Sequence, residues 1–215
     1  MHTTYKHINN KSHKLIIVFT SMNPFFHALE NRDKFEMEGV FNSVDLEYDL
    51  LFIKDIPAPH WYLLGIEETK EMIQAIVSKY SQVVCTGISS GGYASILFGS
   101  LFNVDLVIAI NPQTYFLDLK TNTLLLPPRV EALFSDIPNI EQYYNLKPFM
   151  NETTIYYANG HHNLHNKNTN PVQQRLHHIE HFNNIKDKTN VHWLDFFVPG
   201  IKNGQLMALI KKHVT

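Results

Sequence analysis

The sequence predicts a three-layer α/β fold, with helices on both faces of a mostly parallel sheet of about six strands. Short apolar, β-branched runs alternate along the chain with helical patterns. The runs at 14–20 and 104–110 are apolar throughout, which is typical of strands covered on both faces. A glycine-rich turn also joins a strand at 83–86 to a helix, and parallel strands need such helical crossovers.

The expected elements follow in chain order. Strands are predicted at 14–20, 46–53, 83–86, 104–110, 153–158 and 191–197, because each run is short, apolar and bounded by polar or turn residues. Helices are predicted at 67–80, from residue 90 onward, and near the end of the chain, where Asn203 would be the N-cap. Three prolines between residues 124 and 139 predict an irregular segment that forms a minimal cap.

Composition limits the class of protein. The 215 residues are 44% hydrophobic and contain no linker or repeat, so we expect a single domain over residues 1–215. The net charge is −2, and lysines and acids are interspersed. This pattern argues against nucleic acid or an acidic membrane surface as a partner and favours a small molecule or a glycan. The oligomeric state is left open.

Cysteine usage and hydropathy indicate the compartment. The one cysteine, Cys85, excludes an internal disulfide, and we interpret it as a buried strand residue. Residues 1–14 are polar, and no apolar run reaches the length of a membrane span. We therefore expect a cytoplasmic protein.

The stretch 83–95 carries the clearest chemical signal. A G-x-S-x-G pattern at Gly87, Ser89 and Gly91 lies between a strand and a helix. A nucleophile elbow needs this order, because its serine sits on a sharp turn at the carboxyl end of a strand. The alternative is a glycine-rich turn that binds phosphate or only connects two elements.

An elbow serine needs donors for the oxyanion that forms on a substrate carbonyl. The amide of Ser90 is the first predicted donor, because it follows the nucleophile at the helix start. The second donor usually comes from the loop after an earlier strand. Ser21 and Met22 hold that position here.

A proline-stiffened loop at 54–62 carries His60, Trp61 and Tyr62. It follows a predicted strand, and aromatic rings at a strand end can stack on a sugar. We assign these three residues to substrate binding, while noting that such rings also pack onto a domain's own surface.

Three motifs together resemble a known family. They are the Trp61-Tyr62 loop, the Gly87 to Ala94 elbow and the turn Asn111-Pro112-Gln113-Thr114. They look like a bacterial family of small α/β-hydrolase-like proteins associated with capsule and other surface-polysaccharide gene clusters. The resemblance covers residues 46–114. It implies an α/β-hydrolase-like fold and acyl-ester chemistry on a glycan, either removal of an O-acetyl group or its transfer, with acetyl-CoA as a candidate donor. We place Gln113 with the substrate-binding residues.

The catalytic partners of Ser89 depart from the usual pattern. The loop after strand 153–158, where a triad acid normally resides, contains His161, His162 and His165 but no acid. The loop after strand 191–197 contains no histidine. We therefore predict His162 or His165 as the base, with Asp195 as the orienting acid, and Lys202 or His60 as the next candidates for the base.

Two other interpretations remain open. The histidines at 161–165, with His177, His178 and His181, could hold zinc, although no acid or cysteine accompanies them at a recognised spacing, and we predict no metal site. Alternatively, the chain is a catalytically inactive glycan-binding protein of polysaccharide biosynthesis.

Overall fold

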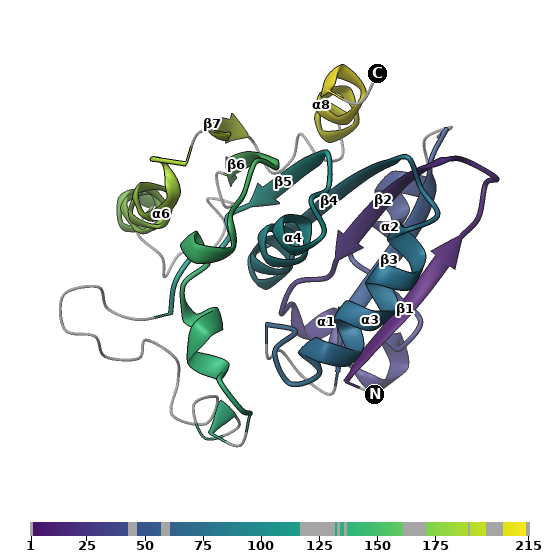
Figure 1. The fold of residues 1–215 in the computed structure, drawn as a ribbon, viewed down its shortest axis with the longest axis horizontal. Coiled ribbons are helices and arrows are strands. Elements are labelled where there is room, and N and C mark those ends of the chain that lie inside the picture. The colour runs from purple at the N-terminus through teal and green to yellow at the C-terminus, as the bar shows by residue number, and fades with distance from the viewer. Residues whose placement is uncertain are drawn as a thin grey trace.

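A seven-stranded sheet with the order β1-β3-β2-β4-β5-β6-β7 forms the centre of the protein, seen here in a computed structural model (Figure 1). The described residues are 2–42, 47–56, 61–116, 132, 134–135, 137–160, 171–188, 190–196 and 204–213. The strands are β1 (Thr3–Ile8), β2 (Lys14–Phe19), β3 (Asp49–Asp55), β4 (Gln82–Ile88), β5 (Leu106–Ile110), β6 (Thr154–Gly160) and β7 (Val191–Phe196). Only β1 runs antiparallel to its neighbour, β3. The predicted mostly parallel sheet is confirmed.

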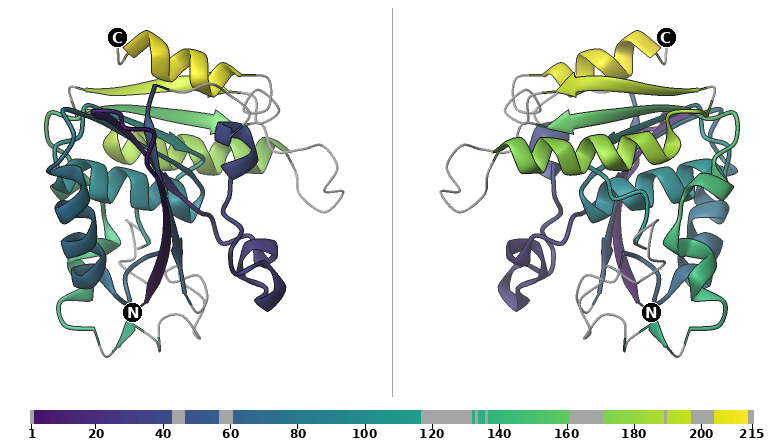
Figure 2. Two further views of the ribbon diagram at one scale, coloured as in Figure 1. Left: turned by 90° about the vertical axis from the view of Figure 1, so that its right-hand side faces the viewer. Right: turned by 90° about the vertical axis from the view of Figure 1, so that its left-hand side faces the viewer.

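Helices cover both faces of the sheet. The described helices are α1 (Pro24–His27), α2 (Glu38–Asn42), α3 (Ile66–Val77), α4 (Ser90–Leu101), α6 (Pro171–Ile185) and α8 (Gln205–His213), with short 3-10 helices η1 (Leu29–Asn31), η2 (Ile140–Tyr144) and η3 (Lys147–Phe149). The α3, α4 and α6 helices pack on one face, and α2 and α8 on the other (Figure 2). The three-layer prediction is therefore confirmed.

The sequence of β2 explains why this sheet is buried on both sides. Leu15, Ile17 and Phe19 join the apolar core under α3 and α4. The alternate residues Ile16 and Val18 join the core under α2 and α8. Successive side chains of a strand point to opposite faces, so a continuous apolar run fills two cores at once.

The first strand is a correction, because the sequence predicts no strand or helix within residues 1–13. β1 pairs with β3 in a register that places Tyr5 opposite Ile53. Tyr5 is 44% exposed, and Thr3 at the start of the strand is buried. An edge strand buries little of its surface, so its sequence, TTYKHI, lacks the apolar run that identified the other strands.

The parallel strands β2 to β7 deliver their following loops to one edge of the sheet. These loops begin at Thr20, Ile56, Ser89 and Asn111. Open α/β sheets bind ligands at this edge.

The predicted cap between residues 124 and 139 falls mostly outside the described residues, and the Asn203 N-cap lies wholly outside them. No helix within the described ranges combines the length and the apolar character needed to cross a bilayer.

Candidate active site

Ser89 forms the turn between β4 and α4, where the sequence predicts it. Its backbone has φ 54° and ψ −116°, a conformation that residues with a Cβ rarely adopt. The Ser89 amide donates a 2.8 Å hydrogen bond to the Ile110 carbonyl, and the Tyr93 amide donates to the Ser89 carbonyl at 2.9 Å. Such strain costs about 1–3 kcal/mol and persists only where the surrounding structure holds it. The two hydrogen bonds hold the turn on both sides.

The flanking glycines allow the chain to pack closely at this turn. A Cβ on Gly91 would lie 2.2 Å from the Phe19 carbonyl oxygen, and one on Gly87 would lie 2.5 Å from the Gly91 carbonyl oxygen. No side chain fits at either distance. The end of β2 therefore lies directly against the first turn of α4, which brings the loop at Thr20 beside the elbow.

The start of α4 offers backbone donors. Ser90 is the first residue of the helix, and the Ser89 side chain makes no capping hydrogen bond. The first amides of a helix have no partner within the helix, and the helix dipole favours negative charge there. The Ser90 amide therefore has the position predicted for an oxyanion donor, and its catalytic role stays a prediction.

Ser21 is a correction, because its amide has another partner. The Ser21 amide donates to a Glu36 carboxylate oxygen at 2.7 Å, and the Ser21 hydroxyl donates to the other oxygen at 2.9 Å. Burial raises the pKa of Glu36, while the two hydrogen bonds from Ser21 oppose that change. An amide held by a carboxylate is not available to an oxyanion.

Met22 remains as the predicted donor from this loop. The His27 Nε2 atom lies 2.9 Å from the Ser21 carbonyl oxygen. A carbonyl only accepts, so this nitrogen carries the proton. Because a trans peptide is planar, its carbonyl and its amide point in opposite directions. His27 thus turns the Met22 amide away from itself, and this amide donates to no described residue.

The turn after β5 brings Gln113 to Ser89. Its Nε2 atom lies 3.5 Å from the Ser89 hydroxyl oxygen, a long contact, and its Oε1 atom is buried without a described partner. Asn111 opens the turn at φ 47°. Gln113 therefore lies next to the elbow with an unused acceptor, which suits the predicted contact with substrate.

Histidines of α6 hold that turn in place. The Thr114 amide donates to His181 Nδ1 at 3.1 Å, so the His181 proton is on Nε2, which lies 3.0 Å from His177 Nε2. Burial, followed by the charges of His177 and His178, lowers the pKa of His181 to about 3. His181 is thus a neutral residue with both ring nitrogens engaged. Within the described ranges, no three His, Cys, Asp or Glu residues are grouped to hold a metal ion.

The predicted sugar-stacking wall is a second correction. Tyr62 is 1% exposed, and its hydroxyl donates to the Thr20 carbonyl at 2.7 Å. Trp61 is 7% exposed and packs edge-on against Phe116, with ring centroids 5.0 Å apart. Both residues have positive φ, which turns the chain and directs the rings into the core. Tyr62 supports the loop at Thr20, Trp61 packs on Phe116, and neither ring presents a face to a ligand.

The predicted base and acid are not described. His161, His162 and His165 lie in segment 161–170, and His60 and Lys202 lie in 57–60 and 197–203, all outside the described residues. The backbone of Asp195 pairs with Asn159 near the carboxyl ends of β6 and β7. Its side chain is outside the described part. These assignments stay predictions.

Sequence reasoning missed Glu36 and His27. Both follow β2 along the chain, yet each acts through a hydrogen bond to the backbone of Ser21. No motif or spacing marks such contacts. The only available signal is that an acid and a histidine lie close behind a strand-end loop that needs to be held in one conformation.

Comparison with solved structures identifies the fold. No protein-family model and no curated sequence matches the chain. A capsule O-acetyltransferase of Neisseria meningitidis serogroup A is similar at TM-score 0.60 and 15% identity, over 97% of this chain and 90% of that one. The FphF serine hydrolase of Staphylococcus aureus, which binds fluorophosphonates, is similar at TM-score 0.52 and 11% identity, over 95% of this chain and 84% of that one.

A further similarity is to the Gap123 glycosylation-associated protein complex of Streptococcus agalactiae, at TM-score 0.59 and 14% identity. It covers 98% of this chain, which spans less than half (44%) of the matched chain. At such identities the likeness shows the fold alone. The chain has the α/β-hydrolase fold that the sequence predicts.

Proposed function

We propose that this chain performs serine-dependent acyl-ester chemistry, as an O-acetyl esterase or O-acetyltransferase. The observation that carries the proposal is the conformation of Ser89. Ser89 is a non-glycine residue held at φ 54° between a strand and a helix. Glycines flank it and let the end of β2 pack closely against the turn. This is the arrangement of a nucleophile elbow. Strain of this kind is concentrated at functional sites.

The reaction follows from these groups. The Ser89 hydroxyl oxygen attacks the acyl carbon while a base accepts its proton, and the carbonyl oxygen becomes an oxyanion. Collapse of this intermediate expels the leaving group, the alcohol of an ester or the thiol of acetyl-CoA. The leaving group takes the proton from the base, and the acyl group stays on Ser89. Water, or the hydroxyl of an acceptor, then attacks the acyl-serine in a second step of the same kind.

The amides of Ser90 and Met22 are the proposed oxyanion donors. Ser90 supplies an uncapped amide at the start of α4. Met22 supplies an amide whose direction follows from the hydrogen bond between His27 and the Ser21 carbonyl. Removal of one oxyanion donor typically costs about 3 kcal/mol of transition-state stabilisation.

The proposed base is His162 or His165, with Asp195 as the acid that orients it. Their loop follows β6, whose carboxyl end lies on the same edge of the sheet as Ser89. Among the described histidines, His181 is hydrogen-bonded to the turn that carries Gln113. It is unsuited to act as the base, because burial lowers its pKa to about 3.

The proposed substrate is an acylated bacterial surface glycan or its precursor, or a glycan acceptor for acetyl transfer. Support comes from the sequence resemblance and from the names of two similar structures, a capsule O-acetyltransferase and a glycosylation-associated complex. A similar structure is the H228A mutant of the same acetyltransferase in complex with CoA, which makes acetyl-CoA the first donor to test. Gln113, beside Ser89, is the proposed polar contact for the sugar.

The test is acetate release from acetylated sugars, and acetyl transfer from acetyl-CoA to free sugars, by wild type and by Ser89→Ala. Ser78→Ala is the control, because Ser78 is an exposed residue at the end of α3. We expect activity that Ser89→Ala abolishes and Ser78→Ala preserves. Equal activity of wild type and Ser89→Ala would contradict the proposal, and glycan binding without activity would favour the inactive glycan-binding protein.

A further inference from the structure

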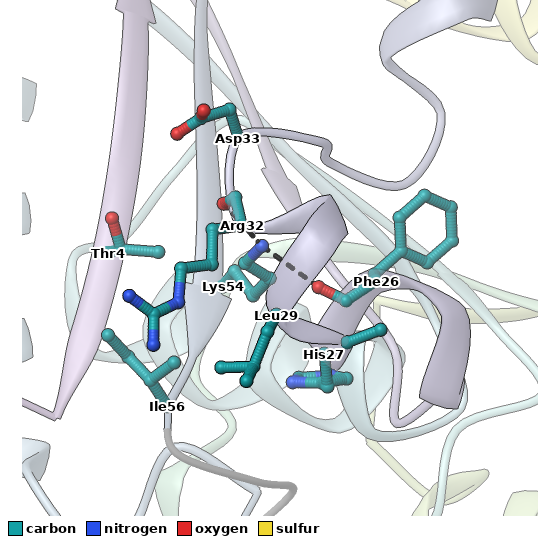
Figure 3. A pocket seen from close by; sticks show the side chains of 9 residues that line it. Thr4, Phe26, His27, Leu29, Arg32, Asp33, Lys54 and Ile56 are labelled. Atoms are coloured by element: carbon teal, nitrogen blue, oxygen red, sulfur yellow. Dashed lines mark hydrogen bonds between the residues drawn. The ribbon is translucent and has the colours of Figure 1, made fainter.

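A cavity of about 490 Å³ lies beside the segment that follows β2 (Figure 3). Its lining comes from three parts of the chain: Thr4 of β1, Lys54 and Ile56 at the end of β3, and residues 26–29 and 32–33 of the α1 and η1 region. Its volume falls within the usual range for small-molecule sites. The lining includes neither Ser89 nor Gln113, so this cavity is separate from the proposed catalytic site.

Lys54 makes the cavity wall rigid. It is 2% exposed, and its ammonium group donates to the Phe26 and Arg32 carbonyls at 2.9 and 2.7 Å, with further contacts to the Asn31 and Lys34 carbonyls. No described carboxylate forms an ion pair with it. The wall therefore carries a buried positive charge that neutral dipoles satisfy. Burial lowers the pKa of Lys54, and the negative charge of Asp33 opposes that change.

One further group with unused hydrogen-bonding capacity faces the cavity. The Arg32 guanidinium lies between Thr4 and Ile56 (Figure 3) and forms no ion pair with a described residue. His27 also lines the cavity, but its Nε2 atom donates to the Ser21 carbonyl, and its Nδ1 atom is a buried acceptor that donates no hydrogen bond to an anion. Asp33 is the one acid of the lining, and its side chain points away from the centre (Figure 3).

The remaining walls are apolar. Leu29 and Ile56 line the cavity with Ala28, and Leu29 is 73% exposed. A leucine so exposed gains from contact with an apolar group that excludes water. The cavity thus combines a cationic donor, the Arg32 guanidinium, with an apolar surface.

We propose that this cavity binds a small organic anion, a carboxylate or a phosphate monoester with a short apolar chain. The anionic group pairs with the Arg32 guanidinium, whose planar fork matches either oxyanion. The apolar chain packs on Leu29 and Ile56. Because His27 joins the cavity to the Ser21 carbonyl, the ligand lies one side chain away from the loop beside the elbow.

Calorimetric titration with hexanoate, hexyl phosphate and neutral hexanol tests the proposal. We expect at least one anionic probe to bind wild type about tenfold more tightly than hexanol. The ratio of the two anions identifies which anionic group the site prefers. Ser89→Ala should bind that probe as wild type does, which separates this site from the proposed catalytic one.

Matched variants locate the binding site. Arg32→Ala should weaken the affinity for the anionic probe by about tenfold. Arg32→Lys should weaken it by less, because a lysine keeps the positive charge but loses the planar, two-pronged guanidinium. Lys34→Ala removes a neighbouring charge that does not line the cavity and should leave the affinity unchanged. Leu29→Asn should also weaken binding. Equal affinities of the wild type for the anions and for hexanol would overturn the proposal. So would a folded Arg32→Ala variant that binds the anionic probe as tightly as the wild type does.

Discussion

The amide and hydroxyl of Ser21 both donate to the carboxylate of Glu36, at 2.7 and 2.9 Å. This pair ties the loop after β2 to a residue 15 positions further along the chain. The loop lies beside Ser89, since the Phe19 carbonyl abuts Gly91. The position of the loop at the candidate site thus depends on a side chain that is not itself part of the elbow.

Replacing Glu36 should destabilise the protein. Glu36→Ala leaves the Ser21 amide without its acceptor, and an unsatisfied buried donor costs about 1–3 kcal/mol. Glu36→Gln keeps one acceptor oxygen and should cost less. The measurement is the free energy of unfolding in urea. Equal values for wild type and Glu36→Ala would mean that the contact contributes nothing to the fold.

His27 should influence catalysis through the Met22 amide. His27→Leu removes the donor that holds the Ser21 carbonyl, so the peptide can rotate, and we expect kcat for an activated acetyl ester to fall about tenfold to a hundredfold. His27→Gln retains an N–H donor and should recover much of the rate. KM should change little in either variant. A His27→Leu enzyme with wild-type kcat would show that Met22 is not the second donor.

The elbow glycines should not tolerate a side chain. Gly91→Ala places a methyl group 2.2 Å from the Phe19 carbonyl oxygen, and we expect a loss of at least about 1–3 kcal/mol of unfolding free energy. Gly39→Ala is the control, because nothing lies within 4 Å of its added Cβ on α2. Thermal unfolding compares the two variants. A Gly91→Ala protein as stable as Gly39→Ala would contradict the close packing of β2 and α4.

Buried His181 should make the protein sensitive to acid. Its folded pKa of about 3 is below the 6.5 of a free imidazole, so between these values the unfolded chain binds a proton that the folded chain does not. Stability should therefore fall as the pH is lowered through this range, by up to about 1.4 kcal/mol per pH unit.

Urea unfolding at a series of pH values measures this slope. His181→Asn keeps an acceptor for the Thr114 amide and removes the titrating ring, so its slope should be smaller. His13→Gln replaces an exposed histidine and should leave the slope as in wild type. If wild type and His181→Asn showed the same slope, His181 would not be the residue responsible.

The elbow was predictable because its signals are local. The apolar run of β4, the two glycines and Ser89 are consecutive in the sequence, and steric rules alone require glycine where the chain packs so closely. The central strands were predictable for a similar reason, since burial on both faces leaves a continuous apolar run.

The corrected features depend on long-range contacts or on backbone geometry. The edge strand β1 forms because β3 offers it a partner, and its own sequence is polar. The inward turn of Trp61 and Tyr62 follows from their positive φ values, which side-chain character does not reveal. The pairing of Ser21 with Glu36 joins residues whose proximity only the folded chain creates.

The central claim is that Ser89 is an activated nucleophile. Mass spectrometry of tryptic peptides after treatment with a fluorophosphonate probe tests it most directly, because such probes phosphonylate activated serines. We predict one modified peptide in the wild type, with the added mass on Ser89, and no modification in Ser89→Ala or in heat-denatured protein. An unmodified wild type, or an adduct on a different serine that persists in Ser89→Ala, would contradict the claim.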